Sequence, residues 1–301
     1  MRGIRFGLFV AFFLCVLGAS PLHAARVVVV KSDALASYNE AVTAFTMQSP
    51  DTLSEYNLAK NAVTGRKIFA QLAAQPPDLI LSVGPLATSL AKELVKTTPI
   101  LFLMVPDNQA ESLRADTITG ISLYVPAQAQ LSLLKELTPA ITRVGIVHSV
   151  EESSPSFDPA RQAAKTLGIT LVFAKVGESG QVPAALAGLK GKIDALWLLP
   201  DDVVLSPAAH EALVAHSLKE HLPFMTLTPR LVKAGALVSL SADFAALGRQ
   251  AAVLANKILR ENAKPATLPI AAPEGLNLAF NLGTAKLIGQ EKEAGLRLLA
   301  I

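Results

Sequence analysis

Short apolar runs alternate with helical stretches along this chain, and the alternation occurs twice. Runs of this kind, separated by helices of roughly 10–15 residues, are typical of buried strands in a parallel sheet. The first set of predicted strands covers 26–31, 77–84 and 98–104, and the second covers 142–149, 193–201 and 222–227. The repetition predicts an α/β protein with two similar Rossmann-like lobes, each built on a parallel sheet.

The segments between these strands show helical periodicity. In 243–260, Phe244, Leu247 and Ala251 fall on one face, and Asp243 precedes them at a position that favours helix capping. Weaker versions of the same pattern predict helices at 62–74, 85–96, 127–137, 158–167, 181–189 and 207–219.

Three extended segments lie where the chain is expected to pass between the lobes. They cover 120–125, 236–241 and a stretch near 265–272. Three crossings restrict two lobes to hinge and twist motion about a shared axis. We therefore expect the first lobe to comprise 25–121 plus 241–265, and the second to comprise 122–240 plus 266–301.

The amino-terminal segment 1–24 has the features of a secretory signal. Arg2 and Arg5 precede an apolar run that ends at Leu17, and Ala24 is a small residue suited to cleavage. Cys15, the only cysteine, follows Leu14 rather than the small residue that a lipoprotein signal requires. We therefore expect a periplasmic protein without a lipid anchor, whose mature form has no thiol and no disulfide.

The charge balance excludes some partners. Without residues 1–24 the chain has 25 basic side chains (27 minus Arg2 and Arg5) against 24 acidic ones, and no basic stripe. Nucleic-acid binding is therefore not expected. No second apolar stretch approaches the length of about 20 residues that spans a membrane. After cleavage we expect no stable membrane insertion.

Candidate binding residues follow the predicted strands, because ligands of parallel sheets bind beyond the carboxyl ends of the strands. Those of the first lobe are Gly84, Pro85, Leu86, Thr88, Pro106, Asp107 and Ser122. Those near the crossings and in the second lobe are Tyr124, His148, Ser153, Ser154, Asp201, Thr228 and Asp243.

Gly84-Pro85 admits two interpretations. Proline in a first helical turn costs no hydrogen bond, and glycine lets a ligand approach the backbone. The free amides from Leu86 to Ser89, with the hydroxyl of Thr88, would then hold a carboxylate or another anion. The alternative is an ordinary turn from strand to helix.

Asp201 and Asp202 also admit two roles. One carboxylate would pair with a ligand ammonium, and the other would cap the helix that begins near Ser206. Adjacent side chains point in different directions, so we expect one residue in each role. No nucleophile or third orienting group accompanies them, which argues against an acid–base pair.

The remaining candidates are also weighed against structural roles. His148 ends a buried strand and is either a hydrogen-bonded core residue or a ligand contact. Tyr124 faces either a hinge or the ligand, whereas Trp197 lies in mid-strand and is expected in the core. The spacing of the other histidines does not favour a metal site. No motif of a known nucleophile, phosphate loop or zinc protease is present, so we expect no catalytic residue, metal or cofactor.

Several motifs resemble those of a known family. Gly235-Ala-Leu-Val-Ser239, Ala242-Asp-Phe244 and Leu247-Gly-Arg-Gln-Ala-Ala252 are similar to the carboxy-terminal signature of ABC-transporter substrate-binding proteins of the tryptophan/tyrosine-receptor-like group. The likeness continues in 264–266 and 280–286, and earlier in 77–80 and 192–195. It covers most of the mature chain and is strongest over 190–290.

The resemblance implies a periplasmic binding protein fold of type 1, with ligand capture by lobe closure and delivery to a permease with its ATPase. The family's pocket positions then fall near Gly84-Pro85-Leu86, Val105-Pro106-Asp107, Ser122, Ser153-Ser154, Asp201 and Thr228. The chain departs from the family at Thr228-Pro229, where an acidic residue is common. The ligand is expected to be a small polar molecule, with an amino acid or related compound as one option.

Three functional classes remain at this stage. The first is a monomeric solute receptor for import, which needs no catalytic residue. The second is a periplasmic sensor or envelope-interaction protein that uses the same bilobed fold. The third is a periplasmic hydrolase, which requires a nucleophile within reach of His148. Ser149, Ser153 and Ser154 are the nearest in sequence.

Overall fold

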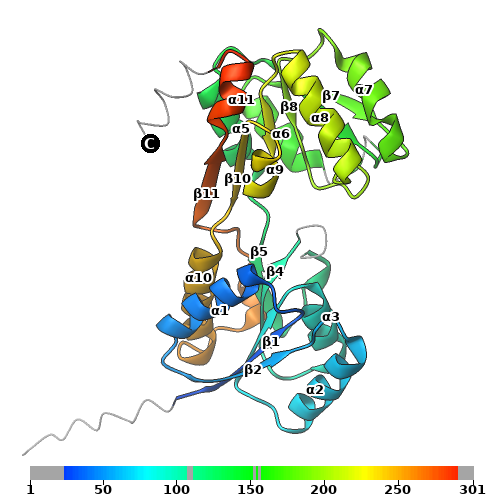
Figure 1. Cartoon of the computed structure of the whole chain (residues 1–301). Helices are drawn as coiled ribbons and strands as arrows, with labels where there is room; N and C mark the ends of the chain where they lie inside the picture. Colours follow the sequence, from blue (N-terminus) through cyan, green and yellow to red (C-terminus); the bar gives the residue numbers. More distant parts are fainter. Residues whose placement is uncertain (1–23, 107–110, 152–153, 155–156, 291–301) are drawn as a thin grey trace, which may run out of the picture.

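The computed structural model describes residues 24–106, 111–151, 154 and 157–290, and it contains two α/β lobes (Figure 1). The sheet of the first lobe has the strand order β2-β1-β3-β4-β5, and every neighbouring pair is parallel. Its strands are β1 (Arg26–Lys31), β2 (Thr52–Asn57), β3 (Leu79–Val83), β4 (Ile100–Val105) and β5 (Ile118–Ser122).

Helices cover both faces of this first sheet. Alternate residues of β1 point to opposite sides, so that Val27 packs with one cluster and Val28 with the other. One face is covered by α1 (Ala36–Gln48) and α10 (Phe244–Leu259), and the other by α2 (Ala62–Ala74) and α3 (Pro85–Leu94). Two 3₁₀ turns, η1 (Glu111–Leu113) and η4 (Pro265–Thr267), complete this lobe.

The sheet of the second lobe has the order β11-β10-β9-β8-β6-β7. Its pairs are parallel except β10 with β11, which is antiparallel. The strands are β6 (Arg143–His148), β7 (Thr170–Lys175), β8 (Ala195–Trp197), β9 (Phe224–Thr226), β10 (Val238–Ala242) and β11 (Leu276–Phe280).

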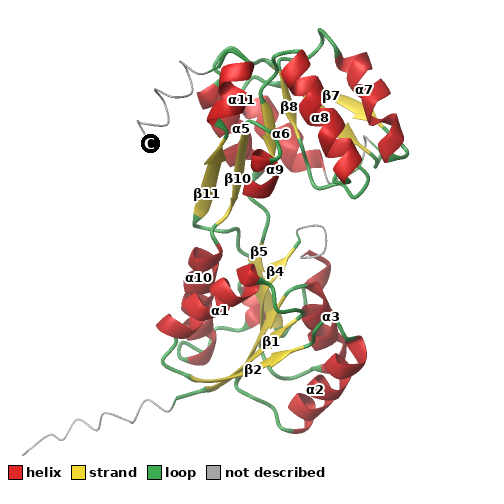
Figure 2. Cartoon of the chain, in the orientation of Figure 1, coloured by secondary structure: helices red, strands yellow, loops and turns green. Residues whose placement is uncertain are grey.

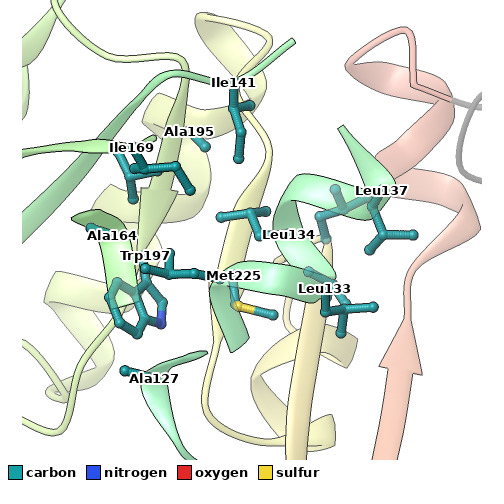
Figure 3. Packing of buried hydrophobic residues seen from close by; sticks show 14 of the residues in the cluster. Ala127, Leu133, Leu134, Leu137, Ile141, Ala164, Ile169, Ala195, Trp197 and Met225 are labelled. Carbon is teal, nitrogen blue, oxygen red and sulfur yellow. The ribbon is translucent and has the colours of Figure 1, made fainter. Parts of the chain in front are cut away.

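Helices again cover both faces of the second sheet. One face is covered by α5 (Ala127–Leu137), α6 (Asp158–Thr166) and α11 (Leu282–Leu287). Figure 3 shows the core on this side, where Leu134 of α5 lies near Trp197 and Met225 of the sheet. The other face is covered by α7 (Val182–Leu189), which follows η3 (Ser179–Gln181), and by α8 (Pro207–Lys219) and α9 (Pro229–Lys233).

Within the described residues, the chain passes between the lobes three times, as predicted. It leaves β5 for α5, returns from β10 to α10, and crosses again between Ala271, which bridges to Ile121 of β5, and β11 (Figure 1). The third passage therefore follows 265–271, because this stretch still packs on the first lobe.

The predicted α/β architecture with two parallel sheets is confirmed. Helices α2, α5 and α8 have the predicted bounds. The strand predicted over 193–201 was too long: β8 ends at Trp197, shortly before Pro200, which has no amide hydrogen for a ladder. The pattern did not predict β2, β7, β11, α1, α9 or α11.

Candidate functional site

The carboxyl edge of each sheet faces the other lobe across the crossings. The carboxyl end of β5 leads directly into the second lobe, and the carboxyl end of β10 leads directly into the first (Figure 2). Apart from β11, the other strands of each sheet run parallel to β5 or to β10. Their carboxyl ends therefore lie at the same edge of the sheet as the carboxyl end of β5 or β10. The residues that follow these strands thus occupy the position where ligands of such sheets bind.

Gly84 lies at the first of these edges in a conformation that requires glycine. Its φ is +90°, and a Cβ atom there would lie 2.4 Å from the hydroxyl of Tyr38 and 2.7 Å from that of Ser32. The close packing places Tyr38 and Ser32 beside the turn that leads into α3. Burial raises the pKa of the Tyr38 phenol, and nearby Asp33 adds to this effect. The phenol therefore stays protonated at neutral pH.

Sequence reasoning missed Ser32 and Tyr38. The stretch 32–60 showed only weak periodicity, and the mostly exposed β2 offered no apolar run. A usable signal was present, since Ser32 follows a buried strand directly and Tyr38 lies in the first turn of the next helix.

The amino terminus of α3 differs from the expected cradle of free amides. The amide of Ala87 donates to Ser32 Oγ (2.9 Å), and that of Thr88 donates to the carbonyl of Gly84 (3.2 Å). Thr88 is fully buried, and its hydroxyl bonds to Ser82 and Gly84 within the lobe. Amides from Ala87 onward are therefore not free for an anion, and Pro85 and the half-buried Leu86 form the accessible part of this turn.

The other predicted residues of the first lobe lie at the same edge. Pro106 follows β4 and is exposed, whereas Asp107 lies outside the described residues. Ser122 is buried at the end of β5, where its hydroxyl oxygen accepts the amide of Tyr124 (2.8 Å). Tyr124 is half-buried and packs against the core of the second lobe, so it connects the first crossing to that lobe.

Asp201 is held by hydrogen bonds on both carboxylate oxygens. Oδ2 accepts from the amide and hydroxyl of Ser149 (2.7 and 2.8 Å), and Oδ1 accepts from the amides of Val203 and Val204 (3.0 and 3.1 Å). These four donors occupy the lone pairs that an ammonium would need. Asp201 therefore fastens the loop after β8 to the end of β6. The exposed Asp202 is the carboxylate that remains available.

The prediction that Asp201 or Asp202 caps α8 was wrong. Neither aspartate caps this helix, because the hydroxyl of Ser206 accepts the amide of Ala209 (3.3 Å). Asp243 does cap α10, with its Oδ1 accepting the amide of Ala246 (2.7 Å), as the sequence predicted. Thr228 is exposed and caps the short helix α9 through Leu231.

His148 is a core residue in this structure. Its side chain is buried between the rings of Phe157 and Phe173 at edge-to-face angles, and Nδ1 bonds to the carbonyl of Val150 (2.8 Å). Nε2 has no hydrogen-bond partner among the described residues. Ser149 donates to Asp201 instead, Ser154 is half-buried nearby in sequence, and Ser153 lies outside the described residues. The described side chains thus contain no serine–histidine pair at this position.

This geometry, with two parallel sheets, facing carboxyl edges and three crossings, is that of the type 1 periplasmic binding proteins. Residues 40–293 match the family described as ABC transporter substrate binding protein. The chain belongs to that family. The resemblance noted in the sequence is therefore confirmed, and members of this family act as substrate-binding receptors rather than enzymes.

One named relative and two solved structures are similar to this chain. A tyrosine-binding protein from Clostridioides difficile is 25% identical over 244 residues, which cover 78% of this chain and 70% of that protein. The ligand-free, open structure of a substrate-binding protein with adhesive properties from Clostridium difficile is 20% identical. It has a TM-score of 0.73 over 88% of this chain and 95% of that chain.

A third structure, from Streptococcus pneumoniae in complex with L-Trp, is 22% identical, with a TM-score of 0.58 over 89% and 99% of the two chains. At this level of identity the two solved structures define the fold only.

The described residues of this substrate-binding protein contain no cluster of histidine and carboxylate side chains that would hold a metal ion. In the same part of the chain, no helix has both the length and the apolar character needed to cross a membrane.

Proposed function

We propose that this substrate-binding protein captures a small polar molecule between its lobes and delivers it to an ABC permease with its ATPase. The observation that carries the proposal is the pair of facing carboxyl edges, which directs the loops after the parallel strands of each sheet toward the opposite lobe. Ligand bound there contacts both lobes at once and therefore stabilises the closed arrangement over the open one.

An α-amino acid or a related compound is the ligand class that we propose. A relative of 25% identity is named for tyrosine binding, and a similar structure contains L-Trp. In this chain the accessible groups at the facing edges include the half-buried side chains of Leu86 at the start of α3 and Tyr124 at the first crossing, and the exposed Asp202 after β8. Asp202 would hold the ammonium, because Asp201 is already fully hydrogen-bonded.

The cellular setting follows from the family and the amino-terminal segment. Substrate-binding proteins of ABC importers work outside the cytoplasm. We propose cleavage of residues 1–24, a periplasmic mature protein that is monomeric, and no catalytic role. For the lobes we propose the division predicted from the sequence, 25–121 with 241–265 and 122–240 with 266–301, except that 266–271 is assigned to the first lobe, on which it packs.

Thermal melting of residues 25–301 against amino acids, nucleosides, sugars and small organic acids tests the proposal. A ligand of the native state adds RT ln(1 + [L]/Kd), about 2.7 kcal/mol at a hundredfold excess over Kd. We expect a raised Tm with one class, and a smaller radius of gyration in solution scattering when that ligand closes the lobes.

Two matched variants locate the site. Asp202→Asn is expected to keep the Tm of the free protein and weaken the ligand-induced shift. Asp201→Asn is expected to lower the Tm of the free protein and keep the shift, because Asp201 fastens a loop. A protein whose Tm and radius respond to no compound class would contradict capture between the lobes.

A further inference from the structure

A groove lies between α8 and α9, and every residue that lines it belongs to the second lobe. Its cavity volume is about 630 Å³, within the range of roughly 300–1,000 Å³ typical of small-molecule sites. Val214, Ala215 and Leu218 of α8 and Leu231 and Ala234 of α9 give it an apolar wall. No residue of the first lobe takes part, and of the candidate binding residues predicted from the sequence only Thr228, which follows β9, also lines the groove.

His210 gives this groove an unsatisfied polar group. The residue is 6% exposed and lines the groove, yet neither Nδ1 nor Nε2 has a hydrogen-bond partner among the described residues. A buried polar group without a partner destabilises a folded protein and is uncommon. A ligand in the groove would supply the missing partner.

The protonation state of the His210 ring determines which hydrogen bonds it can form with a ligand. Burial lowers the pKa of the imidazole, and the backbone of Leu231, which lies nearby outside hydrogen-bonding geometry, offsets part of this effect. The ring is therefore neutral at neutral pH, with one nitrogen as donor and the other as acceptor. It can donate a hydrogen bond to an anion or to a neutral oxygen.

The charges at the groove favour an anion at one end. Arg230 lines the groove and is exposed. It lies in the first turn of α9, and Pro207 brings the amino terminus of the 13-residue α8 to the same end, where the helix dipole favours negative charge. Glu211 also lines the groove and opposes this preference.

We propose that the groove between α8 and α9 is a second ligand site, which takes a small carboxylate with an aromatic or branched aliphatic body. The carboxylate lies at the end formed by His210, Arg230 and Thr228, and the body lies along Val214 and Leu218. This proposal does not depend on the identity of the ligand between the lobes and stands whether or not that ligand is an amino acid.

The test uses 3-phenylpropanoate, its neutral analogue 3-phenylpropanamide and L-phenylalanine, with the histidine ring resonances of the mature protein followed by NMR. The His210 signal is assigned by its absence in His210→Leu. Titration with 3-phenylpropanoate should move it, whereas the signal of His216, on the same helix but outside the groove, should stay in place. The amide should bind about tenfold more weakly because it lacks the charge.

Variants separate binding from folding. Ala215→Trp fills the groove and should abolish the shift, and Ala208→Trp, at an exposed position of the same helix outside the groove, should not. His210→Leu should have an unchanged or higher Tm, because it removes an unsatisfied buried group. A markedly lower Tm would mean that His210 has a partner in the folded chain, which would overturn the premise.

Two further variants test the charge assignment. Arg230→Gln should weaken binding of 3-phenylpropanoate about tenfold, and Glu211→Gln should strengthen it. If Glu211→Gln weakened binding and L-phenylalanine bound more tightly than 3-phenylpropanoate, the carboxylate assignment would fail in favour of a zwitterion. A His210 resonance that none of the three probes moves at millimolar concentration would overturn the site.

Discussion

The indole nitrogen of Trp197 donates a hydrogen bond to the side-chain oxygen of Gln130, with the two atoms 3.0 Å apart in the core of the second lobe. The amide nitrogen of Gln130 in turn donates to the carbonyl of Val125, 2.8 Å away. Val125 belongs to the first crossing between the lobes. A single buried side chain therefore fastens a crossing segment to the central strand β8.

Gln130→Leu is expected to lower the free energy of unfolding by about 1–3 kcal/mol, because it leaves the indole nitrogen and the Val125 carbonyl unpaired. Trp197→Phe should also destabilise the protein, since it leaves the side-chain oxygen of Gln130 unpaired and creates a small cavity. Urea unfolding of the single and double variants measures the coupling. The double variant should lose less than the sum of the singles, and strictly additive losses would refute the linkage.

Gly84→Ala is expected to destabilise the protein by about 2–3 kcal/mol, because the new methyl group meets Tyr38 and Ser32 in addition to the cost of a positive φ. Gly168→Ala is the matched control. Gly168 also has a positive φ (+65°), but no atom lies within 4 Å of the added Cβ, so the expected loss is only about 1 kcal/mol. Equal losses in thermal and urea unfolding would show that the turn into α3 tolerates a side chain.

Asp194 should contribute stability that disappears in acid. It accepts hydrogen bonds from Arg143 and from the amide and hydroxyl of Thr142, which outweigh partial burial and lower its pKa to about 2. Since this pKa is below the unfolded value near 3.8, the stabilisation is present above about pH 4 and is lost as the pH falls toward 2. Solvent screening reduces it to about 1 kcal/mol.

Urea unfolding of the wild type and Asp194→Asn between pH 7 and pH 2 measures this contribution. The difference in free energy of unfolding should be near 1 kcal/mol at neutral pH and should lose most of this value by pH 2. Asp202→Asn, at an exposed position, provides a control for the loss of one negative charge. A difference that stays constant across the range would contradict the assigned pKa.

The sequence predicted the architecture because buried parallel strands leave continuous apolar runs. Residues 26–31 and 79–83 are almost entirely buried, and their bounds were predicted closely. The edge strand β2 was missed because five of its six residues are exposed, so no burial pattern constrained them. The weak signal of α1 has a different cause, since its apolar face packs on α10, which is distant in sequence.

The candidate site was predicted less well because strand ends can be located from sequence while hydrogen-bond partners cannot. Asp201 follows its strand as expected, but its carboxylate is occupied by Ser149, 52 positions away in sequence. His148 was placed at the same edge, yet Phe157 and Phe173 enclose its ring. Gly84 was singled out as a position where a ligand approaches the backbone. In the structure its positive φ and the packing of Tyr38, which lies in a region without a clear pattern, explain the glycine.

The packing of α10 on α1 also fixes the order in which the molecule can be completed. The two helices approach so closely that a Cβ atom at Gly248 would lie 2.0 Å from the carbonyl oxygen of Ala41. A chain that emerges amino terminus first exposes the apolar face of α1 until α10 is available, after nearly all of the second lobe. The first lobe, although synthesised first, thus stays incomplete until α10 is made, which leaves an apolar helix face exposed for a long interval and makes the growing chain dependent on protection from aggregation.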